Sequence, residues 1–358
     1  MEVGIMGLAG SGKTTLFNLL TGIDASPQGG HRGATQVGIA RVPDARLDRL
    51  SKLYHPEKTT PATIRYVDVS GLPEEHRRDS AFNVPELRGT DALMVVLRAF
   101  DNDAVAHPLV EIDPLRDLRH IEDEFILQDQ MVIERRIERI ERDLRTRKVP
   151  ELERERELLQ RCLMVLENER PLRGEEFSAA EAKILKGFTF LSSKPVLLVI
   201  NVGEEHIGFD PSGDDGWADI LARPQTVCTS VCATLEHELT QLGRDDADEL
   251  MTEYGISDRA LDRVIRESYR LLGAVSFFTV GEDECRAWTV IEGTPAVEAA
   301  GVIHTDIQRG FIRAEVVSVA DLLKAGSLAS CRQEGSLRLE GKTYPVGDGQ
   351  IIHFRFNV

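Results

Sequence analysis

The ten residues 6–15, MGLAGSGKTT, follow an apolar run at the start of the chain and constrain the fold more than any other stretch. They fit the pattern G-x-x-x-x-G-K-[ST], and an amphipathic segment over residues 13–20 comes next. The glycines allow backbone N–H groups to turn toward phosphate oxygens, and the N-terminus of the following helix adds partial positive charge. The stretch therefore predicts a phosphate-binding loop between a strand and a helix. The matching residues are Gly7, Gly12, Lys13 and Thr14.

The side chains of this loop have expected roles. We expect Lys13 to reach the β and γ phosphates of a nucleotide and to assist hydrolysis there, and the Thr14 hydroxyl to bind Mg²⁺. A glycine-rich turn without a ligand is the alternative, which the flanking strand and helix disfavour. The other loop positions expected to contact the nucleotide are Gly10, Ser11 and Thr15.

Strand and helix signals alternate over the first hundred residues. Apolar runs at 3–6, 37–42, 64–69 and 92–97 are separated by a helical pattern and by a polar, glycine-rich stretch at 22–35. This rhythm is typical of an α/β fold with a parallel sheet and helical crossovers. A similar rhythm returns after residue 190, which indicates that the nucleotide-binding fold is split into residues 1–112 and 190–273.

Residues 113–189 have a different texture. Apolar residues recur at helical spacing from 113 to 147, and a second such pattern begins at Pro150, which suits the first turn of a helix. We expect an antiparallel helical hairpin inserted in the nucleotide-binding fold. The run RRIERIERDLRTRK over residues 135–148 contains seven Lys and Arg residues and is net positive. A solvated helix face and a nucleic-acid-binding patch both explain this run.

The last part of the chain, residues 274–358, contains short β patterns between glycine turns and one small helix near residues 296–300. We expect a mixed-sheet module of about 85 residues, a size at which independent folding is plausible. Its aromatic residues alternate along the strands, so a role in the core is the simplest explanation for most of them.

A second motif separates switch proteins from other phosphate-loop proteins. In YVDVSGL, Asp68 ends an apolar strand and Gly71 follows, which gives D-x-x-G. In this pattern the Asp holds Mg²⁺ through water and the Gly amide senses the γ phosphate during catalysis. Many switch GTPases place a water-orienting Gln next, but here that catalytic position is Leu72, which is apolar.

A third motif concerns the base. Switch GTPases use N-K-x-D, whose Asp accepts hydrogen bonds from guanine, whereas this chain has Asn201, Val202, Gly203 and Glu204. Placing the carboxylate on a longer side chain removes the reason for a guanine preference. Asn201 can still donate and accept hydrogen bonds along the N6/N7 edge of adenine. After the next strand, Cys232 and Ala233 lie where backbone amides complete such base pockets.

Composition limits the partners and the location. The chain has 358 residues, 43 Lys and Arg, 60 Asp and Glu, and a net charge of −17, so any contact with nucleic acid must be local. No run of 18 apolar residues occurs, and neither a signal peptide nor a membrane span fits. Five scattered cysteines suit neither a disulfide framework nor a zinc site. We expect a cytoplasmic protein without membrane or DNA partners.

The ordered motifs and several long stretches closely resemble the Obg-like ATPase (YchF) family over nearly the whole chain. The stretches are DVSGL, DALMVVLRAFDN, DPLRDLRHIEDEFILQDQMVIERRIERIE, KPVLLVINVGEE, AGVIHTDIQRGFIRAEVVS and LEGKTYPVGDGQIIHFRFNV. The resemblance implies a P-loop NTPase fold (Ras-like G domain) with an inserted antiparallel coiled-coil arm and a C-terminal β-grasp TGS domain linked to the ribosome and RNA. It also implies that ATP is preferred over GTP through Asn201 and Glu204, and that hydrolysis occurs despite Leu72.

The sequence departs from the family pattern at two places. These departures limit which family properties can be assigned to this chain. The family usually has Asn at the position of Gly10 and Val at that of Ser11. That Asn is associated with a bound monovalent cation in related proteins, so potassium stimulation is not carried over to this chain. The first switch is also shortened or rewritten relative to the family. We assign its Mg²⁺-binding threonine to Thr35, with Thr21 or a backbone group as alternatives.

The sequence favours a slow, Mg²⁺-dependent ATPase switch that acts with the ribosome or RNA, in translation or stress response. Two alternatives stay open: a GTPase with a degenerate base motif, and a nucleotide-gated ribosome or RNA adaptor with negligible turnover. A phosphate-loop kinase is disfavoured because D-x-x-G and N-x-x-E follow in the order of switch proteins. Among charged residues near the switch by sequence, Arg77, Arg78 and Arg98 fit surface positions best, and His76 fits a solvated loop.

Overall fold

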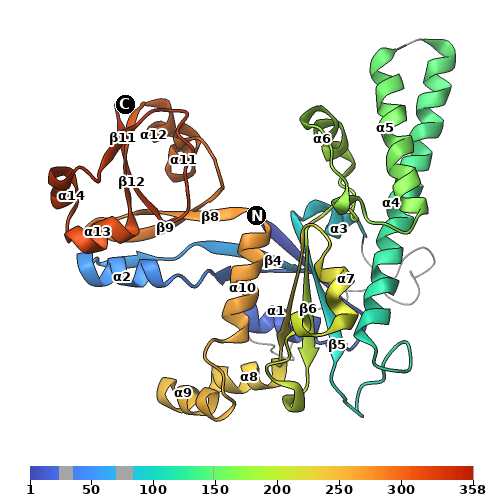
Figure 1. Ribbon diagram of the computed structural model, residues 1–358, viewed down its shortest axis with the longest axis horizontal. Coiled ribbons are helices and arrows are strands. Elements are labelled where there is room, and N and C mark those ends of the chain that lie inside the picture. The colour runs from blue at the N-terminus through green and yellow to red at the C-terminus, as the bar shows by residue number, and fades with distance from the viewer. Residues whose placement is uncertain (24–34, 70–83, 148, 358) are drawn as a thin grey trace. The chain divides into compact units, whose positions relative to one another are not determined.

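The computed structural model describes residues 1–23, 35–69, 84–147 and 149–357 (Figure 1). The chain folds into two compact units, Met1–Gly38 with Arg65–Val264 and Ile39–Ile64 with Ile265–Val358. Residues 39–64, which the sequence assigns to the nucleotide-binding domain, therefore group with the C-terminal module. Within the described part of the chain, none of the helices combines the length and apolar composition that a membrane span requires.

The first sheet has the strand order β2-β4-β1-β5-β6-β7. β4, β1, β5, β6 and β7 pair in parallel along this order, which confirms the parallel sheet expected from the alternating pattern. Every residue of β6 is buried, as is typical of a strand covered on both faces. The strands are β1 (Glu2–Met6), β2 (Gln36–Arg41), β4 (Thr63–Asp68), β5 (Ala92–Ala99), β6 (Val196–Val202) and β7 (Thr226–Val231).

Short helices accompany this sheet. α1 begins and ends beside glycines in the left-handed region, Gly12 with φ 90° and Gly22 with φ 65°, so its bounds follow from glycine chemistry. The core combines apolar residues of β1, β5 and β6 with Leu235 and Leu239 of α8. The helices are α1 (Lys13–Thr21), α3 (Val84–Gly89), α7 (Ala218–Leu221), α8 (Ala233–Gln241), α9 (Arg244–Glu253) and α10 (Ala260–Leu271).

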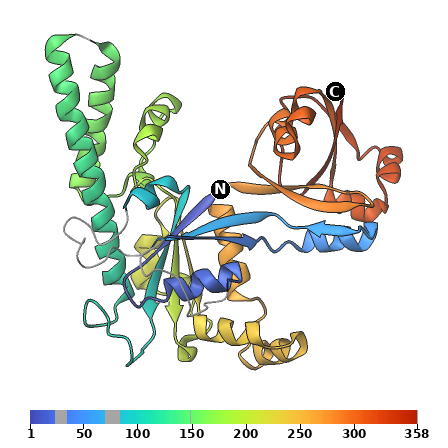
Figure 2. The same cartoon turned by 180° about the vertical axis from the view of Figure 1, so that it is seen from behind.

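The inserted segment forms the expected helical hairpin. α4 (Pro114–Thr146) starts where the Asp113 side chain accepts a hydrogen bond from the Arg116 N–H at 3.0 Å, and α5 (Pro150–Glu167) runs beside it (Figures 1 and 2). Its seam is apolar and includes a charged pair, Arg136 with Glu155, whose Nε and Oε1 atoms lie 2.7 Å apart. Buried seam residues include Ile126, Ile133, Ile140, Leu158, Leu159, Cys162, Val165 and Leu166. The shorter α6 (Ala179–Leu185) follows and begins with a capping box at Ser178.

The C-terminal module is a β-grasp. Its first and last strands, β8 and β12, pair in parallel at the centre, and β9 and β10 flank them antiparallel, giving the order β11-β10-β12-β8-β9. α11 (Ala296–Ile303) packs Ala296, Ala299 and Ala300 into the core. The strands are β8 (Ala274–Thr279), β9 (Glu284–Ile291), β10 (Phe311–Ser318), β11 (Arg338–Glu340) and β12 (Gln350–Phe356).

The expectation of a single small helix in this module was wrong. Three more occur, of five to seven residues each, too short for a clear helical period to show in the sequence. Their caps are nevertheless visible, because the Ser318 hydroxyl accepts from the Asp321 N–H at 3.0 Å and Gly326 ends the same helix with φ 78°. They are α12 (Thr305–Arg309), α13 (Val319–Ala325) and α14 (Leu328–Glu334).

A sixth strand joins this sheet from the first part of the sequence. β3 (Lys58–Thr60) pairs in parallel with β9, and the Thr60 hydroxyl donates to Glu284 Oε1 at 2.5 Å. α2 (Ala45–Tyr54) comes just before β3 and belongs to the same unit. The segment between the first and second switch motifs thus adds the sixth strand to the C-terminal sheet. The sequence did not predict this pairing.

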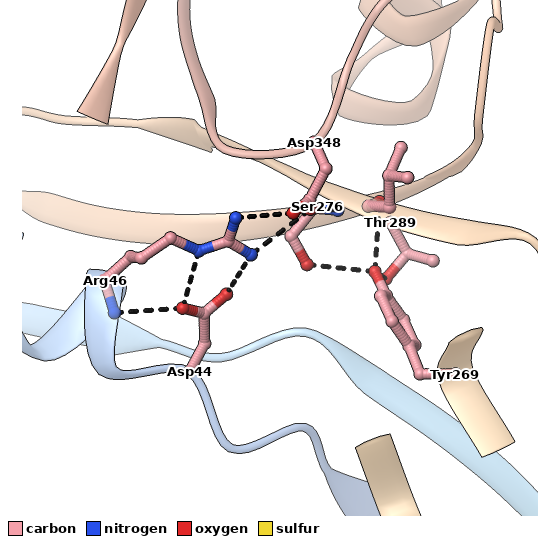
Figure 3. Close-up of polar contacts among 7 residues, drawn as sticks. Asp44, Arg46, Tyr269, Ser276, Thr289 and Asp348 are labelled. Carbon is pink, nitrogen blue, oxygen red and sulfur yellow. Dashed lines mark hydrogen bonds and ion pairs between the residues drawn. The ribbon is translucent and has the colours of Figure 1, made fainter. Parts of the chain in front are cut away.

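A network of hydrogen bonds and ion pairs centred on Arg46 connects this segment to the loop before β12 (Figure 3). The Arg46 guanidinium binds Asp44 through Nε and Nη2 at 2.9 and 2.8 Å, and Asp348 through Nη1 at 2.6 Å. It also lies over the ring of Phe278, 5.3 Å from the centroid. A Cβ on Gly349, whose φ is 75°, would lie 2.8 Å from Arg46 Nη1, so glycine is needed there. The network joins α2 to the loop before β12.

Tyr269 forms the other side of the same network (Figure 3). Its hydroxyl lies 3.0 Å from Ser276 Oγ and 2.9 Å from Thr289 Oγ1, and the Ser276 N–H donates to Asp348 Oδ1 at 3.0 Å. Burial acts to raise the pKa of Asp348, but hydrogen bonds from Arg46 and the Ser276 N–H outweigh it and hold the pKa below 3.8. The contribution of Asp348 to stability is therefore present above pH 3.8 and is lost as the pH falls through its lower folded-state pKa.

Arg46→Met is expected to destabilise the C-terminal unit by about 1–2 kcal/mol, because the apolar stem stays but two carboxylates lose their partner. This range is small because Asp348 is half exposed and solvent screens the pair. Hydrogen exchange of α2 and β12 in the full chain measures the effect, and the difference from the native chain should shrink below pH 3.8. Arg49→Met, at an exposed position of the same helix, is the control and should change little. Equal exchange in the two variants would contradict the assignment.

Candidate nucleotide-binding site

The phosphate-binding loop joins β1 to α1 in a conformation that requires glycine. Gly10 has φ 77° and Gly12 has φ 90°, both in the left-handed region that other residues rarely adopt. The Ser11 N–H donates to the Leu8 carbonyl at 3.2 Å, and the Gly12 carbonyl accepts the first helical bond from the Leu16 N–H at 2.9 Å. The loop therefore turns directly into the first turn of α1, as the motif predicts.

Neighbouring backbone and side chains also approach this loop closely. A Cβ on Gly7 would lie 2.4 Å from the carbonyl oxygen of Val96, and a Cβ on Gly12 would lie 2.4 Å from Asn201 Nδ2. Neither position can hold a side chain without displacing β5 or β6. These two glycines thus seat the loop against the ends of both strands, which positions it beside the residues that follow them.

Thr14 and Asp68 meet at the start of α1. The Thr14 hydroxyl donates to Asp68 Oδ2 at 2.9 Å, and Asp68 is only 2% exposed. Two buried polar atoms, Asp68 Oδ1 and Ser11 Oγ, find no hydrogen-bond partner among the described residues. Buried polar atoms are nearly always paired in native proteins, so these two mark a place where a ligand belongs. Hydroxyl and carboxylate oxygens are the donors that Mg²⁺ prefers, so Thr14 and Asp68 fit this ion.

The charges at this place are incompletely balanced. Burial lowers the pKa of Lys13, and the attraction of Asp68 offsets only part of that change. Burial likewise raises the pKa of Asp68, against the hydrogen bond from Thr14 and the charge of Lys13. Each group is thus held in surroundings that disfavour its charged form. An anion beside Lys13 and a cation beside Asp68 would remove both penalties.

A cavity of about 500 Å³ lies at the carboxyl ends of β5 and β6 and beside the loop. Its size falls within the range of small-molecule sites, and strand ends of this kind are where ligands bind in open α/β sheets. It is lined by Gly12, Thr15, Phe100, Asp101, Asn102, Asn201, Val202, Gly203, Glu204, Glu205, Ala233, Thr234 and His237.

Asn201 connects three parts of the site. Its side chain is 4% exposed, Nδ2 donates to the Ser11 carbonyl at 3.1 Å, and Oδ1 accepts from the Ala233 N–H at 3.2 Å. One Nδ2 hydrogen and one Oδ1 lone pair are therefore used by the protein, which leaves the second Nδ2 hydrogen and the second lone pair of Oδ1 for adenine. The Ala233 amide is engaged in the same way. Asn201 holds the phosphate-binding loop against the start of α8.

Glu204 lies at the mouth of the cavity. It follows β6 and opens a short 3-10 helix, Glu204–His206, with an exposed side chain. Val202 and Cys232 are buried, 5% and 6% exposed. Burial raises the pKa of the Cys232 thiol, and the nearby Glu204 charge adds to this rise. The motif thus places the Glu204 carboxylate in the lining of the cavity, together with those of Glu205 and Asp101.

Known proteins resemble this chain over its whole length. "Ribosome-binding ATPase YchF" of Bacillus subtilis (strain 168) is 39% identical over 372 residues, which cover 100% of both proteins. The chain belongs to the YchF and Obg-like ATPase family. "Obg-like ATPase 1" of Caenorhabditis elegans is 35% identical over 100% of this chain and 92% of that protein. Residues 274–357 match a family model named YchF-GTPase_C and described as a protein of unknown function (DUF933).

A solved structure supports the same family and fold. The "Schizosaccharomyces pombe YchF GTPase" is 27% identical, has a TM-score of 0.85, and matches over 99% of this chain and 97% of that chain. A "GTP binding protein from Pyrococcus horikoshii OT3" has a TM-score of 0.62 at 16% identity, which indicates a shared fold alone. The expected P-loop NTPase architecture with a helical arm and a C-terminal domain is confirmed.

In this YchF-family chain, the loop after β5 contributes residues that sequence reasoning missed. Arg98 was expected at the surface, but it is 3% exposed and lies over the Phe100 ring at 4.9 Å. Its guanidinium donates to the carbonyls of Phe100, Asn102 and Val105 at 3.1, 3.3 and 2.9 Å. An arginine near the end of a buried strand can thus donate hydrogen bonds to three carbonyl groups of the loop that follows. The rule that ligands bind at strand ends could have identified Phe100 and Asn102.

The two switch motifs are described only in part. The Thr35 hydroxyl donates to Glu86 of α3, whereas Thr14 and Asp68 bind each other. The assignment of Thr35 as a Mg²⁺ ligand stays a prediction. Gly71 and Leu72 lie outside the described residues, as do His76, Arg77 and Arg78.

Proposed function

We propose that this YchF-family chain is a Mg²⁺-dependent nucleotide hydrolase that prefers ATP over GTP and acts as a molecular switch with the ribosome in the cytoplasm. The observation that carries this proposal is the cavity that joins the phosphate-binding loop to Glu204. The name "Ribosome-binding ATPase YchF" of relatives such as that of Bacillus subtilis supports the partner and the nucleotide. RNA of the ribosome is the contact we expect.

At the phosphate end, this chain's own residues bind and orient the triphosphate. Lys13 carries a charge that burial disfavours, so a phosphate oxygen nearby restores its stability. Thr14 and Asp68 would hold Mg²⁺, which supplies neutralisation of the phosphate charges when bound. Ser11 Oγ and the N-terminus of α1 offer further polar contacts to the phosphates. Binding of Mg²⁺ and the nucleotide would thus satisfy Asp68 Oδ1 and Ser11 Oγ, which have no partner among the described residues.

At the base end, the length of the Glu204 side chain favours adenine. Guanine recognition in switch GTPases uses an Asp at this position to accept from N1–H and the exocyclic amino group, and adenine lacks both donors. Glu204 lines the cavity beside Phe100 and Asn201. One Nδ2 hydrogen of Asn201 is free to donate to the base. An extra methylene moves the carboxylate away from the place where guanine needs it.

Hydrolysis should be slow without a partner. Leu72 occupies the position at which many switch GTPases orient water with Gln, and an apolar side chain cannot do so. Groups supplied by partners contribute about 10³–10⁵ in rate in related chemistry. We therefore expect the ribosome to change turnover, with Thr35 and Gly71 released when the γ phosphate leaves.

Glu204→Asp is expected to shift the ratio of ATP to GTP affinity by about 10- to 100-fold toward GTP, because a hydrogen bond to a charged group is worth about 1.5–3 kcal/mol. Competition between the two nucleotides on the full chain with Mg²⁺ measures this ratio. Glu205→Asp is the matched control, because Glu205 also lines the cavity but its carboxylate lies 3.2 Å from His206 Nδ1. An unchanged ratio in Glu204→Asp would defeat the base assignment.

Two further measurements test the proposed function as a whole. Single-turnover release of phosphate, with and without ribosomes, separates a hydrolase from an adaptor that only binds nucleotide. Tighter binding of GTP than ATP by the native chain would make the protein a GTPase instead. No affinity for either triphosphate in the presence of Mg²⁺ would end the proposal altogether.

A further inference from the structure

The threonine assigned to the first switch binds a carboxylate of the helix that follows the Asp68 motif. Thr35 and Glu86 are both partly buried, and the Thr35 hydroxyl donates to Glu86 Oε2. The Thr14 hydroxyl donates instead to Asp68. The three residues expected to hold Mg²⁺ therefore fall into two groups in this structure, with Thr14 and Asp68 in one and Thr35 in the other.

Glu86 belongs to a helix that is anchored by the two residues that follow it. In α3, Leu87 is 0% exposed and packs in the core of the nucleotide-binding sheet. Arg88 Nη2 lies 3.1 Å from Asp129 Oδ1, and Asp129 is fully buried in α4. These contacts hold α3 in place, so the pair of Thr35 and Glu86 separates by movement of Thr35.

The chain after Thr35 limits how far this threonine moves. Gly38, in β2, is buried, and a Cβ there would lie 2.3 Å from Thr21 Cγ2 in α1. The strand is therefore packed closely against α1 at this residue. Thr35 lies three residues earlier in the chain, and three extended residues span about 10 Å. A movement of Thr35 within this reach leaves the strand from Gly38 onward in place.

We propose that the hydrogen bond between Thr35 and Glu86 is an autoinhibitory contact, which keeps Thr35 from the Mg²⁺ site until nucleotide binds. This inference rests on the proposed function, and it names the contact that nucleotide binding has to break. A protein conformation that cannot bind lowers the apparent affinity in proportion to its population. A carboxylate is a strong acceptor for such a contact, because hydrogen bonds to charged groups are stronger than those between neutral groups. Thr35 leaves Glu86 when it becomes a ligand of Mg²⁺.

Binding of the β,γ-imido analogue of ATP to the full chain tests the sign of this effect. Glu86→Ala should tighten binding in the presence of Mg²⁺ by about 3- to 10-fold, because the unbound protein loses a contact that the complex does not have. With EDTA in place of Mg²⁺, Thr35 has no ion to bind, and the affinity should change by less than about twofold. Weaker binding would show that Glu86 holds Thr35 at the metal, and unchanged binding would show that the contact has no effect on affinity. Either result would overturn the inference.

Glu86→Gln separates the hydrogen bond from the charge. Removing a negative charge reduces repulsion of the phosphates, and this effect alone would be equal for alanine and glutamine and larger without Mg²⁺. The glutamine amide oxygen still accepts from Thr35, so the gain in Glu86→Gln should be smaller than the gain in Glu86→Ala. Equal gains in the two variants, or a gain that persists in EDTA, would assign the effect to repulsion and contradict the inference. Glu138→Ala makes the same change in charge at an exposed position of α4 and should bind as the native chain does.

Hydrogen exchange gives a measurement that does not depend on nucleotide affinity. Without nucleotide, the amides of residues 35–38 should exchange faster in Glu86→Ala than in the native chain, because Thr35 has lost its partner. With Mg²⁺ and saturating analogue, exchange at these residues should be the same in both proteins. Exchange in α3 should change little, since Leu87 and Arg88 anchor this helix. Equal exchange of residues 35–38 without nucleotide would contradict the inference.

Thr35→Val separates a failure of the inference from a failure of the proposed function. This variant should bind the analogue with Mg²⁺ more weakly than Glu86→Ala, which lacks the same contact but keeps the hydroxyl as a ligand. Adding Glu86→Ala to Thr35→Val should then give no gain, and a full gain in the double variant would overturn the inference. If Thr35→Val binds as tightly as Glu86→Ala, Thr35 is not a Mg²⁺ ligand, and the inference is wrong while the hydrolase function stands. If the native chain binds no nucleotide with Mg²⁺, the proposed function fails first.

Discussion

Asp68→Asn is expected to lower nucleotide turnover by about 10- to 100-fold while making the nucleotide-free protein more stable. The loss follows because an Asp that holds Mg²⁺ through water acts as an outer ligand, and such groups contribute about this factor to metal affinity or activity. The gain follows because Asp68 is 2% exposed and its Oδ1 has no partner among the described residues. Asparagine fills the same space without the buried charge.

The pH dependence of this gain has a definite sign. Burial raises the pKa of Asp68 in the folded chain, so its protonated form is the one that folding favours. The stabilisation that protonated Asp68 gives to the folded chain is complete below pH 3.8, the ordinary pKa of the group. It is lost as the pH rises through the raised pKa of the folded state. The melting temperature of Asp68→Asn should therefore exceed that of the native chain at pH 7, and the difference should narrow toward pH 4.

Phosphate release at saturating ATP measures the turnover, and melting temperatures with and without Mg²⁺ and ATP measure the stability and the effect of nucleotide binding on it. The native chain should be stabilised by the nucleotide, and Asp68→Asn should show little additional stabilisation. Thr14→Val is a useful control, because it removes the hydroxyl that donates to Asp68 Oδ2 and leaves the carboxylate buried. It should lose nucleotide binding without any gain in stability. Normal turnover by Asp68→Asn would remove Asp68 from the site.

The sequence predicted the nucleotide-binding sheet well because each part of the signal is local. The strand that ends at Met6, the glycines at 10 and 12 and the helix from Lys13 follow one another within a single stretch, and each has a physical reason to be there. The arm was predicted for the same reason, since a 33-residue helix repeats its apolar period many times. Long periodic elements and phosphate-binding loops are therefore the safest predictions from one sequence.

The sequence did not predict that residues 39–64 belong with the C-terminal unit. β3 has three residues, too few to show a period, and its partner β9 lies more than 220 positions later. Arg46 and Asp348 are separated by 302 positions, and nothing in the local pattern of either residue names the other. Contacts of this kind depend on the complete fold, so they escape any argument from neighbouring residues.

Within the candidate site, the sequence predicted which residues lie there better than it predicted their hydrogen-bond partners. Asn201 was expected to face the base, but its Oδ1 accepts from Ala233 and one Nδ2 hydrogen goes to Ser11. Arg98 was expected to be solvated, but it holds the loop after β5 through three carbonyls. In this chain both polar residues near strand ends bind backbone groups, and only the geometry separates that role from binding a ligand.

Asp129→Ala is expected to destabilise the first unit by about 3–5 kcal/mol, the usual loss when one partner of a buried ion pair is removed. Asp129 lies inside α4 and is fully buried. Its carboxylate accepts from the N–H groups of Leu191 and Ser192 at 3.1 and 2.8 Å, and Arg88 Nη2 lies 3.1 Å from Oδ1. Alanine would leave two buried amides and a largely buried guanidinium without this acceptor.

The position of Asp129 suggests where the damage would appear. It joins the base of the arm to α3, the first described helix after the Asp68 motif, and to the segment that leads into β6. Hydrogen exchange in α4 and residues 190–194 should increase strongly in Asp129→Ala, and exchange in the β-grasp strands should not. Because the chain has two units, site-resolved exchange is a better measure than a single melting temperature.

Asp129→Asn distinguishes the charge from the hydrogen bonds. Its amide oxygen can still accept from one backbone N–H, so the loss should be smaller than for alanine. Burial raises the pKa of Asp129 despite the opposing pull of the amides and Arg88, which means that the charge itself is disfavoured at this place. If asparagine is as damaging as alanine, the ion pair with Arg88 is what holds the arm. If neither variant changes exchange in α4, the arm is attached by its apolar contacts alone.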